Sequence, residues 1–150
     1  MAGIDVLTSV WRLADLLQKR TDAELAAHGL TRARVEVLTL VVMADADRGR
    51  KLNTQESTTQ AELARRIGVT PRNITGLMDG LERDGLLVRQ PHPRDRRAVV
   101  VVPTDAGRAF VEARVDEAAQ LATQLFGELP DDVRATVIGV LDAATERLTA

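Results

Sequence analysis

Two helix-start signals lie close together in the middle of the chain, and they constrain its fold more than any other feature. Thr59-Gln60-Ala61-Glu62 has the pattern of a capping box, in which the threonine and glutamate satisfy each other's backbone donors. Thr70-Pro71 places a hydroxyl N-cap before a proline at the first helical position, which is another strong start. Gly68 ends the first of these helices. Two helices separated by so brief a turn predict a helix-turn-helix.

The sequence changes its period directly after the second helix, which we expect to end near Gly85. Residues 87–90 resemble a strand, residues 91–97 form a basic turn, and residues 98–102 are dominated by β-branched valines. A hairpin with a basic tip that follows a helix-turn-helix predicts a wing.

Helical segments flank this region on both sides. Apolar residues recur at helical spacing over residues 4–27 and again after Thr31. After the wing, Thr104-Asp105 caps a long helix and Pro130 starts a last one, each with an apolar seam. A chain this small would leave much of these seams in water, so we expect a twofold homodimer that buries them. The predicted fold is mainly α with a small β-hairpin wing.

We expect one integrated domain with four parts. An N-terminal dimerisation helix and a linking helix occupy residues 1–44, the winged helix-turn-helix residues 58–103, and C-terminal dimerisation helices residues 104–150. Residues 45–57 lose all periodicity and carry Gly, Asn, Ser and alternating charge, which predicts an exposed, mobile loop. In an alternative interpretation, the basic residues of this loop contact phosphates of the flanking DNA. The favoured interpretation is a solvated loop.

The net charge of −2 is unevenly distributed along the chain. Residues 59–108 hold nine Arg against six Asp or Glu, whereas the remaining residues are acidic overall. A basic middle between acidic ends indicates a nucleic-acid-binding segment on a solubilising scaffold, with chance clustering as the alternative.

Composition excludes several kinds of site. The chain has no cysteine, so it holds no disulfide framework, thiolate metal site or cysteine redox sensor. The two histidines, His28 and His92, are not clustered with carboxylates, so we expect no metal site and no cofactor. We see no secretion signal, and the apolar runs are too short to span a bilayer, which predicts a cytoplasmic protein without a membrane partner.

The central segment, residues 58–110, resembles the winged helix of the MarR (multiple antibiotic resistance regulator) family of transcriptional regulators. The resemblance rests on the ELARRIGV helix, the LMDGLERDGLLVR junction, the wing Asp95-Arg96-Arg97, and Thr104-Asp105-Ala106-Gly107. The flanking helices, including Gly29-Leu30-Thr31, match the layout of the family's dimerisation region, so the resemblance covers nearly the whole chain. Two departures are the long segment 45–57 and Gly76, where many family members carry a basic residue.

Candidate DNA-binding residues follow from the two reading elements. The start of a helix in the major groove reaches base edges, which suits Arg72 to guanine, Asn73 to adenine, and Thr75 to a phosphate or a thymine methyl. Gln60 is a candidate phosphate contact. In the wing, the resemblance implies that Arg97 enters the minor groove and that Asp95 holds its guanidinium, with Arg94 and Arg96 along the phosphates.

The resemblance further implies a crevice that accepts small aromatic or phenolic anions. Trp11 and Arg12 are the candidate ligand-binding residues, although core or interface packing is the favoured interpretation for Trp11. We therefore expect a sequence-specific regulator of double-stranded DNA, a repressor relieved by a small ligand, bound to a pseudo-palindromic operator. The alternative is a winged-helix protein–protein interaction module without ligand sensing. We find no nucleophile–base pair, phosphate loop or metal constellation that would indicate an enzyme.

Overall fold

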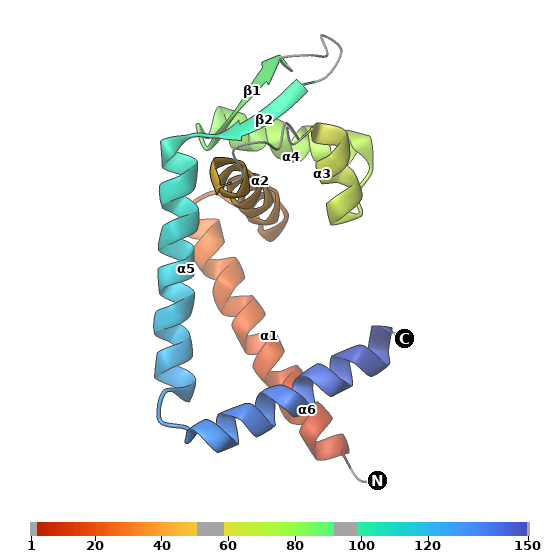
Figure 1. The fold of residues 1–150 in the computed structure, drawn as a ribbon, viewed down its shortest axis with the longest axis vertical. Helices are drawn as coiled ribbons and strands as arrows, with labels where there is room; N and C mark the ends of the chain where they lie inside the picture. Colours follow the sequence, from red (N-terminus) through yellow and green to blue (C-terminus); the bar gives the residue numbers. More distant parts are fainter. Residues whose placement is uncertain (1–2, 51–58, 92–98, 150) are drawn as a thin grey trace. The chain divides into compact units, whose positions relative to one another are not determined.

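The structure is a computed structural model that describes residues 3–50, 59–91 and 99–149. It divides into two compact units, residues 1–111 and residues 112–150. The described ranges contain six helices and one antiparallel pair of strands (Figure 1). In chain order they are α1 (Ile4–Ala27), α2 (Arg32–Arg50), α3 (Gln60–Ile67), α4 (Pro71–Arg83), β1 (Leu87–Pro91), β2 (Val99–Pro103), α5 (Asp105–Phe126) and α6 (Asp131–Thr149). The predicted fold class, a winged helix-turn-helix flanked by helices, is confirmed.

The turn between α1 and α2 forms where the sequence predicts it. Gly29 adopts a positive φ of 69°, a backbone conformation that glycine tolerates without strain. The Thr31 hydroxyl then accepts a hydrogen bond from the Arg34 amide at 3.4 Å, which caps α2. Arg32 pairs through two nitrogens with both carboxylate oxygens of Asp22, at 2.9 and 3.0 Å, and so ties the start of α2 to α1.

The hydrophobic core of the first unit is built around α2. Val37, Leu38 and Val41 of this helix are fully buried, and α2 packs against α3, α4 and β2. The opposing helices contribute large apolar side chains that are equally buried, namely Leu63, Ile74, Met78 and Leu81. One face of α4 is therefore fixed in the core, and its other face remains exposed.

The prediction of a loop from residue 45 was wrong for residues 45–50, because α2 continues to Arg50. The loss of apolar periodicity reflects the end of core contact rather than the end of the helix. Asp45 pairs with Arg108 of α5 at 2.6 Å, so a charged contact supports the helix after the apolar stripe stops. The remaining part of the predicted loop, residues 51–57, lies outside the described residues.

The two strands of the hairpin pair in antiparallel register from Leu87 opposite Pro103 to Pro91 opposite Val99. Leu87 and Val101 are fully buried, so the hairpin is anchored on the core at its base. Thr59, which caps α3, forms an isolated bridge with Val100 and joins the helix-turn-helix to β2.

The chain leaves the hairpin through a closely packed junction with α5. The Thr104 hydroxyl donates to the Gly85 carbonyl oxygen at 2.7 Å and accepts from the Gly107 amide at 3.0 Å. Gly107 is buried, and a Cβ atom there would collide with the carbonyl oxygen of Leu86. The absence of a side chain at Gly107 therefore allows α5 to begin against the end of the helix-turn-helix.

The second unit contains α6 and the part of α5 that follows residue 111, and it buries little of its own apolar surface. No residue of α6 is buried, although α6 carries Val133, Val137, Ile138, Val140 and Leu141. An apolar groove of about 450 Å³ lies between the end of α5 and α6, and its lining includes Phe126, Leu129 and Ile138. In the part of the chain that the structure describes, we find no helix with the length and apolar character needed to cross a membrane.

Candidate nucleic-acid interface

The start of α4 is shaped by its cap. The Thr70 hydroxyl accepts a hydrogen bond from the Asn73 amide at 3.2 Å, and Pro71 occupies the first turn. The helix divides into a buried face and an exposed face. Ile74, Met78 and Leu81 are buried and Leu77 is half-buried, whereas the exposed positions are Pro71, Arg72, Asn73, Thr75, Gly76 and Asp79. This helix therefore presents a guanidinium and a carboxamide side by side in its first turn.

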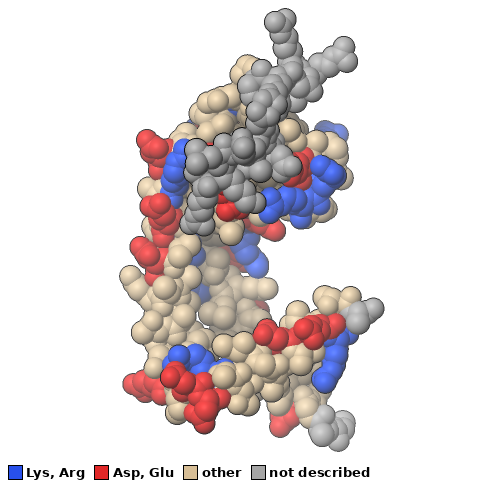
Figure 2. Space-filling view, viewed as in Figure 1, with Lys and Arg blue, Asp and Glu red and all other residues tan. Residues whose placement is uncertain are grey.

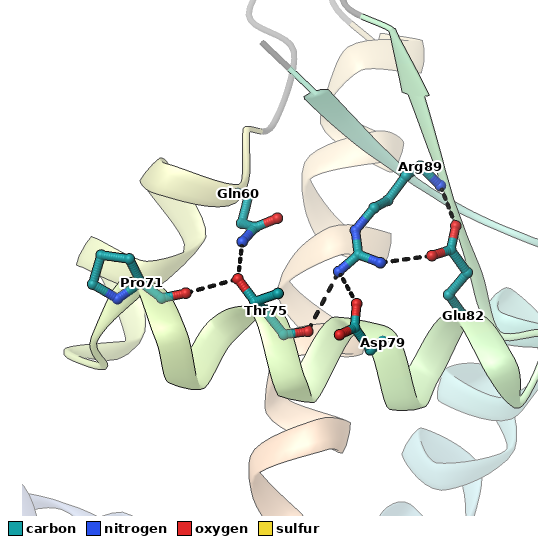
Figure 3. Close-up of polar contacts among 6 residues, drawn as sticks. All are labelled: Gln60, Pro71, Thr75, Asp79, Glu82 and Arg89. Atoms are coloured by element: carbon teal, nitrogen blue, oxygen red, sulfur yellow. Dashed lines mark hydrogen bonds and ion pairs between the residues drawn. The ribbon is translucent and has the colours of Figure 1, made fainter. Parts of the chain in front are cut away.

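Two of the predicted contact residues are bonded to each other. The Gln60 side-chain amide donates to the Thr75 hydroxyl oxygen at 2.5 Å, and that hydroxyl donates to the Pro71 carbonyl oxygen at 2.8 Å (Figure 3). The first residue of α3 thus braces the second turn of α4. The Thr75 hydroxyl thus already has a donor and an acceptor partner within the protein, so it is less available for a hydrogen bond to DNA.

Arg89 is a further residue of this network, which sequence reasoning missed. Its guanidinium lies 2.6 Å from Glu82, 2.7 Å from Asp79 and 3.4 Å from the Thr75 carbonyl oxygen (Figure 3). Its backbone amide also donates to Glu82 at 3.1 Å. Only 20% of the side chain is exposed, so these are partly desolvated contacts, stronger than those of a surface ion pair. Arg89 therefore fixes β1 against two turns of α4.

Additional positive charge lies at the end of α3. Arg65 and Arg66 occupy its last turn and are exposed, and Figure 2 shows basic side chains gathered over this helix. Together with Arg72, they give the helix-turn-helix a cationic rim. These two arginines were not identified from the sequence as candidate contacts. Residues 59–108, in which they lie, were identified as a basic, nucleic-acid-binding segment.

The other predicted residues are placed as follows. Trp11 is 64% exposed on α1, and Arg12 beside it is also exposed. The wing residues Arg94, Asp95, Arg96 and Arg97 lie outside the described residues. His28 is an exposed residue at the end of α1, and its ring meets Phe110 edge-on, with the ring centroids 6.0 Å apart. Within residues 3–50, 59–91 and 99–149 we find no group of three acidic, histidine or cysteine side chains suited to a metal ion.

Comparison with known proteins gives consistent matches. The sequence model of the MarR family matches residues 50–99. The HTH-type transcriptional repressor YetL of Bacillus subtilis is 25% identical over 98% of this chain and 83% of that protein. The transcriptional activatory protein BadR of Rhodopseudomonas palustris is 31% identical over 66% of this chain and 52% of that protein. The MepR protein of Staphylococcus aureus, in its complex with DNA, superimposes with a TM-score of 0.65 at 19% identity, covering 95% of this chain and 97% of that one.

The fold and the exposed α4 face define a winged helix-turn-helix protein. The sequence matches are to the MarR family of transcriptional regulators, and the relatives named above are described as transcriptional regulators. The predicted resemblance is thereby confirmed.

Proposed function

We propose that this regulator binds an inverted-repeat DNA operator as a homodimer and represses transcription until a small ligand releases it. One observation carries the proposal. The first turn of α4 exposes Arg72 and Asn73, while the opposite face of the helix is fixed in the core. Because N-terminal residues of such a helix reach base edges in the major groove, these side chains have the chemistry and the position to read sequence.

The roles within the interface follow from the chemistry of each side chain. Arg72 bonds the acceptors of guanine and Asn73 pairs with adenine. Gln60 retains its carboxamide oxygen and one N–H beside the Thr75 brace, and it contributes to the phosphate contacts. Arg97, held by Asp95, enters the minor groove of the flanking DNA, with Arg94 and Arg96 along the phosphates; these four roles rest on the family resemblance.

Homodimer formation is supported by apolar surface that each unit leaves exposed. On α1 these residues include Leu7, Val10 and Trp11, and on α6 they include Val137 and Leu141. Monomeric proteins rarely expose contiguous apolar patches of this kind. A second copy of the chain supplies matching seams under twofold symmetry, and the two α4 helices then face successive turns of one side of the DNA.

The regulatory part of the proposal is the response to a ligand. Trp11 and Arg12 offer an aromatic face and a cation on neighbouring positions of α1, which suits an aromatic carboxylate or phenolate. A ligand that binds one arrangement of the dimer better than another shifts the population and changes the spacing of the two α4 helices. Repression, rather than activation, is proposed by analogy with YetL, whereas the name of BadR gives the opposite precedent.

The test is a selection of bound sequences from a random pool of double-stranded DNA with the full-length protein. We expect an inverted repeat with half-site centres about 10 base pairs apart, bound with an affinity that falls steeply as salt rises. A screen of aromatic acids for release of that operator tests the ligand response. Weak binding without sequence preference or salt dependence would favour the alternative, a protein–protein interaction module.

A further inference from the structure

The exposed face of α4 has a flat centre, at Gly76. The neighbouring polar side chains on this face form bonds with other groups of the protein. Thr75 uses its hydroxyl to bond Pro71 and Gln60, and Asp79 is held by Arg89 at 2.7 Å (Figure 3). Between them, Gly76 presents only backbone.

The fold does not explain why this position is a glycine. Gly76 has no positive φ, and a Cβ atom added there would meet no described atom within 4 Å. A glycine in the interior of a helix makes that helix less stable than an alanine would, because glycine loses more backbone conformational freedom when the chain folds. Gly80, one turn further along α4, is different, since a Cβ there would lie 2.6 Å from the guanidinium carbon of Arg34. Gly80 therefore has a packing neighbour that a new side chain would displace, whereas among the described residues Gly76 has none.

We propose that Gly76 and Thr75 form a close-approach surface that reads the methyl group of a thymine in the major groove. The inference rests on the proposed function and specifies one base of the half-site. The Thr75 hydroxyl is used within the protein, so the methyl group is what this side chain has left to offer a base. Thymine is the base that presents an apolar group in the major groove, and apolar side chains contact it there. The absence of a side chain at Gly76 lets the helix approach that methyl group closely.

The experiment is a scan of the selected operator in which each thymine is replaced in turn by uracil, which removes only the methyl group. For the wild-type protein we expect one thymine position in each half-site at which uracil weakens binding about fourfold, the value of one buried methyl-sized group. Thr75→Ser keeps the hydroxyl and removes the methyl from the protein side. It should weaken binding by a similar factor and become insensitive to uracil at that same position.

Gly76→Ala tests whether a side chain at this position blocks the close approach of α4 to the DNA. We expect it to raise Tm by about 2–4 °C, because alanine favours the helix, and to weaken operator binding at least tenfold. Uracil at the identified position should recover part of that loss, since it removes the group with which the new Cβ collides. The matched control is Gly139→Ala. Gly139 is an exposed glycine of α6 with an equally open environment, two residues from both Val137 and Leu141 and so on the other side of that helix. This variant should gain similar stability and bind the operator unchanged.

The outcomes separate the inference from the proposed function. If the wild-type protein binds its operator tightly but no thymine methyl affects binding, or if Gly76→Ala binds as well as Gly139→Ala, the close-approach surface is wrong while the DNA-binding role stands. If the wild-type protein selects no operator at all, the proposed function itself fails.

Discussion

Arg89 and Glu82 join the wing strand to α4 through two contacts, one from the guanidinium at 2.6 Å and one from the backbone amide at 3.1 Å. A single carboxylate thus binds both the side chain and the main chain of β1. Because the same guanidinium reaches Asp79 and the Thr75 carbonyl oxygen, the angle between wing and helix is fixed by a planar group with several donors. Arg89 is therefore a positioning residue for the two elements proposed to read DNA.

Arg89→Lys tests this role, because lysine keeps the charge but cannot reach all these acceptors with one point charge. We expect the free energy of unfolding to fall by about 1–2 kcal/mol and operator affinity to fall several-fold. The measurements are urea denaturation at fixed protein concentration and operator titration. Arg83→Lys is the control, since Arg83 is exposed and, among the described residues, pairs with Asp84 at 3.6 Å; it should change neither quantity. Equal behaviour of the two variants would show that Arg89 does not position the wing.

Gly107→Ala tests the junction between the hairpin and α5. The new Cβ atom would collide with the Leu86 carbonyl oxygen, which is backbone and cannot rotate away. We expect a loss of about 1–3 kcal/mol in the free energy of unfolding, the usual cost of overpacking a core. Thermal denaturation beside Gly76→Ala, expected to be more stable than wild type, gives an internal contrast of opposite sign. A stabilised Gly107→Ala protein would contradict the packing described at this junction.

The dimer proposal predicts the effect of shortening the chain. Ending the protein before Val133 removes the apolar residues of α6 and uncovers the surface they are proposed to meet on the second copy. We expect monomers or aggregates with weakened operator binding, measured by light scattering and titration. A soluble, monodisperse monomer that still binds the full operator tightly would refute the proposed dimer.

Much of the fold could be predicted from the sequence, because its helix boundaries carry local signals. Thr59 and Thr70 accept hydrogen bonds from the amides that the capping patterns indicate, and Gly29 and Gly68 end their helices with positive φ. These features depend on neighbouring residues and need no knowledge of tertiary structure.

The failures involve contacts between distant residues. The continuation of α2 to Arg50 was missed because apolar periodicity ends before the helix does, and a contact such as the ion pair from Asp45 to Arg108 is not revealed by that periodicity. Arg89 was missed for the same reason. Its partners Asp79 and Glu82 are spaced three apart on one face of a helix, which was a detectable signal, but their pairing with a strand residue depends on the register of β1.

The most direct test of the central claim compares Arg72→Ala and Arg97→Ala on operators substituted at single base pairs, at one fixed salt concentration. Each variant should lose about 1–3 kcal/mol of operator binding free energy, but in different ways. Arg72→Ala should relax discrimination at one base pair in each half-site and change little at the flanks. Arg97→Ala should flatten the preference for A·T at the flanks and leave half-site discrimination intact, with Asp95→Ala as a milder form of it. If Arg72→Ala discriminates every half-site base as the wild-type protein does, the start of α4 does not read sequence and the account is wrong.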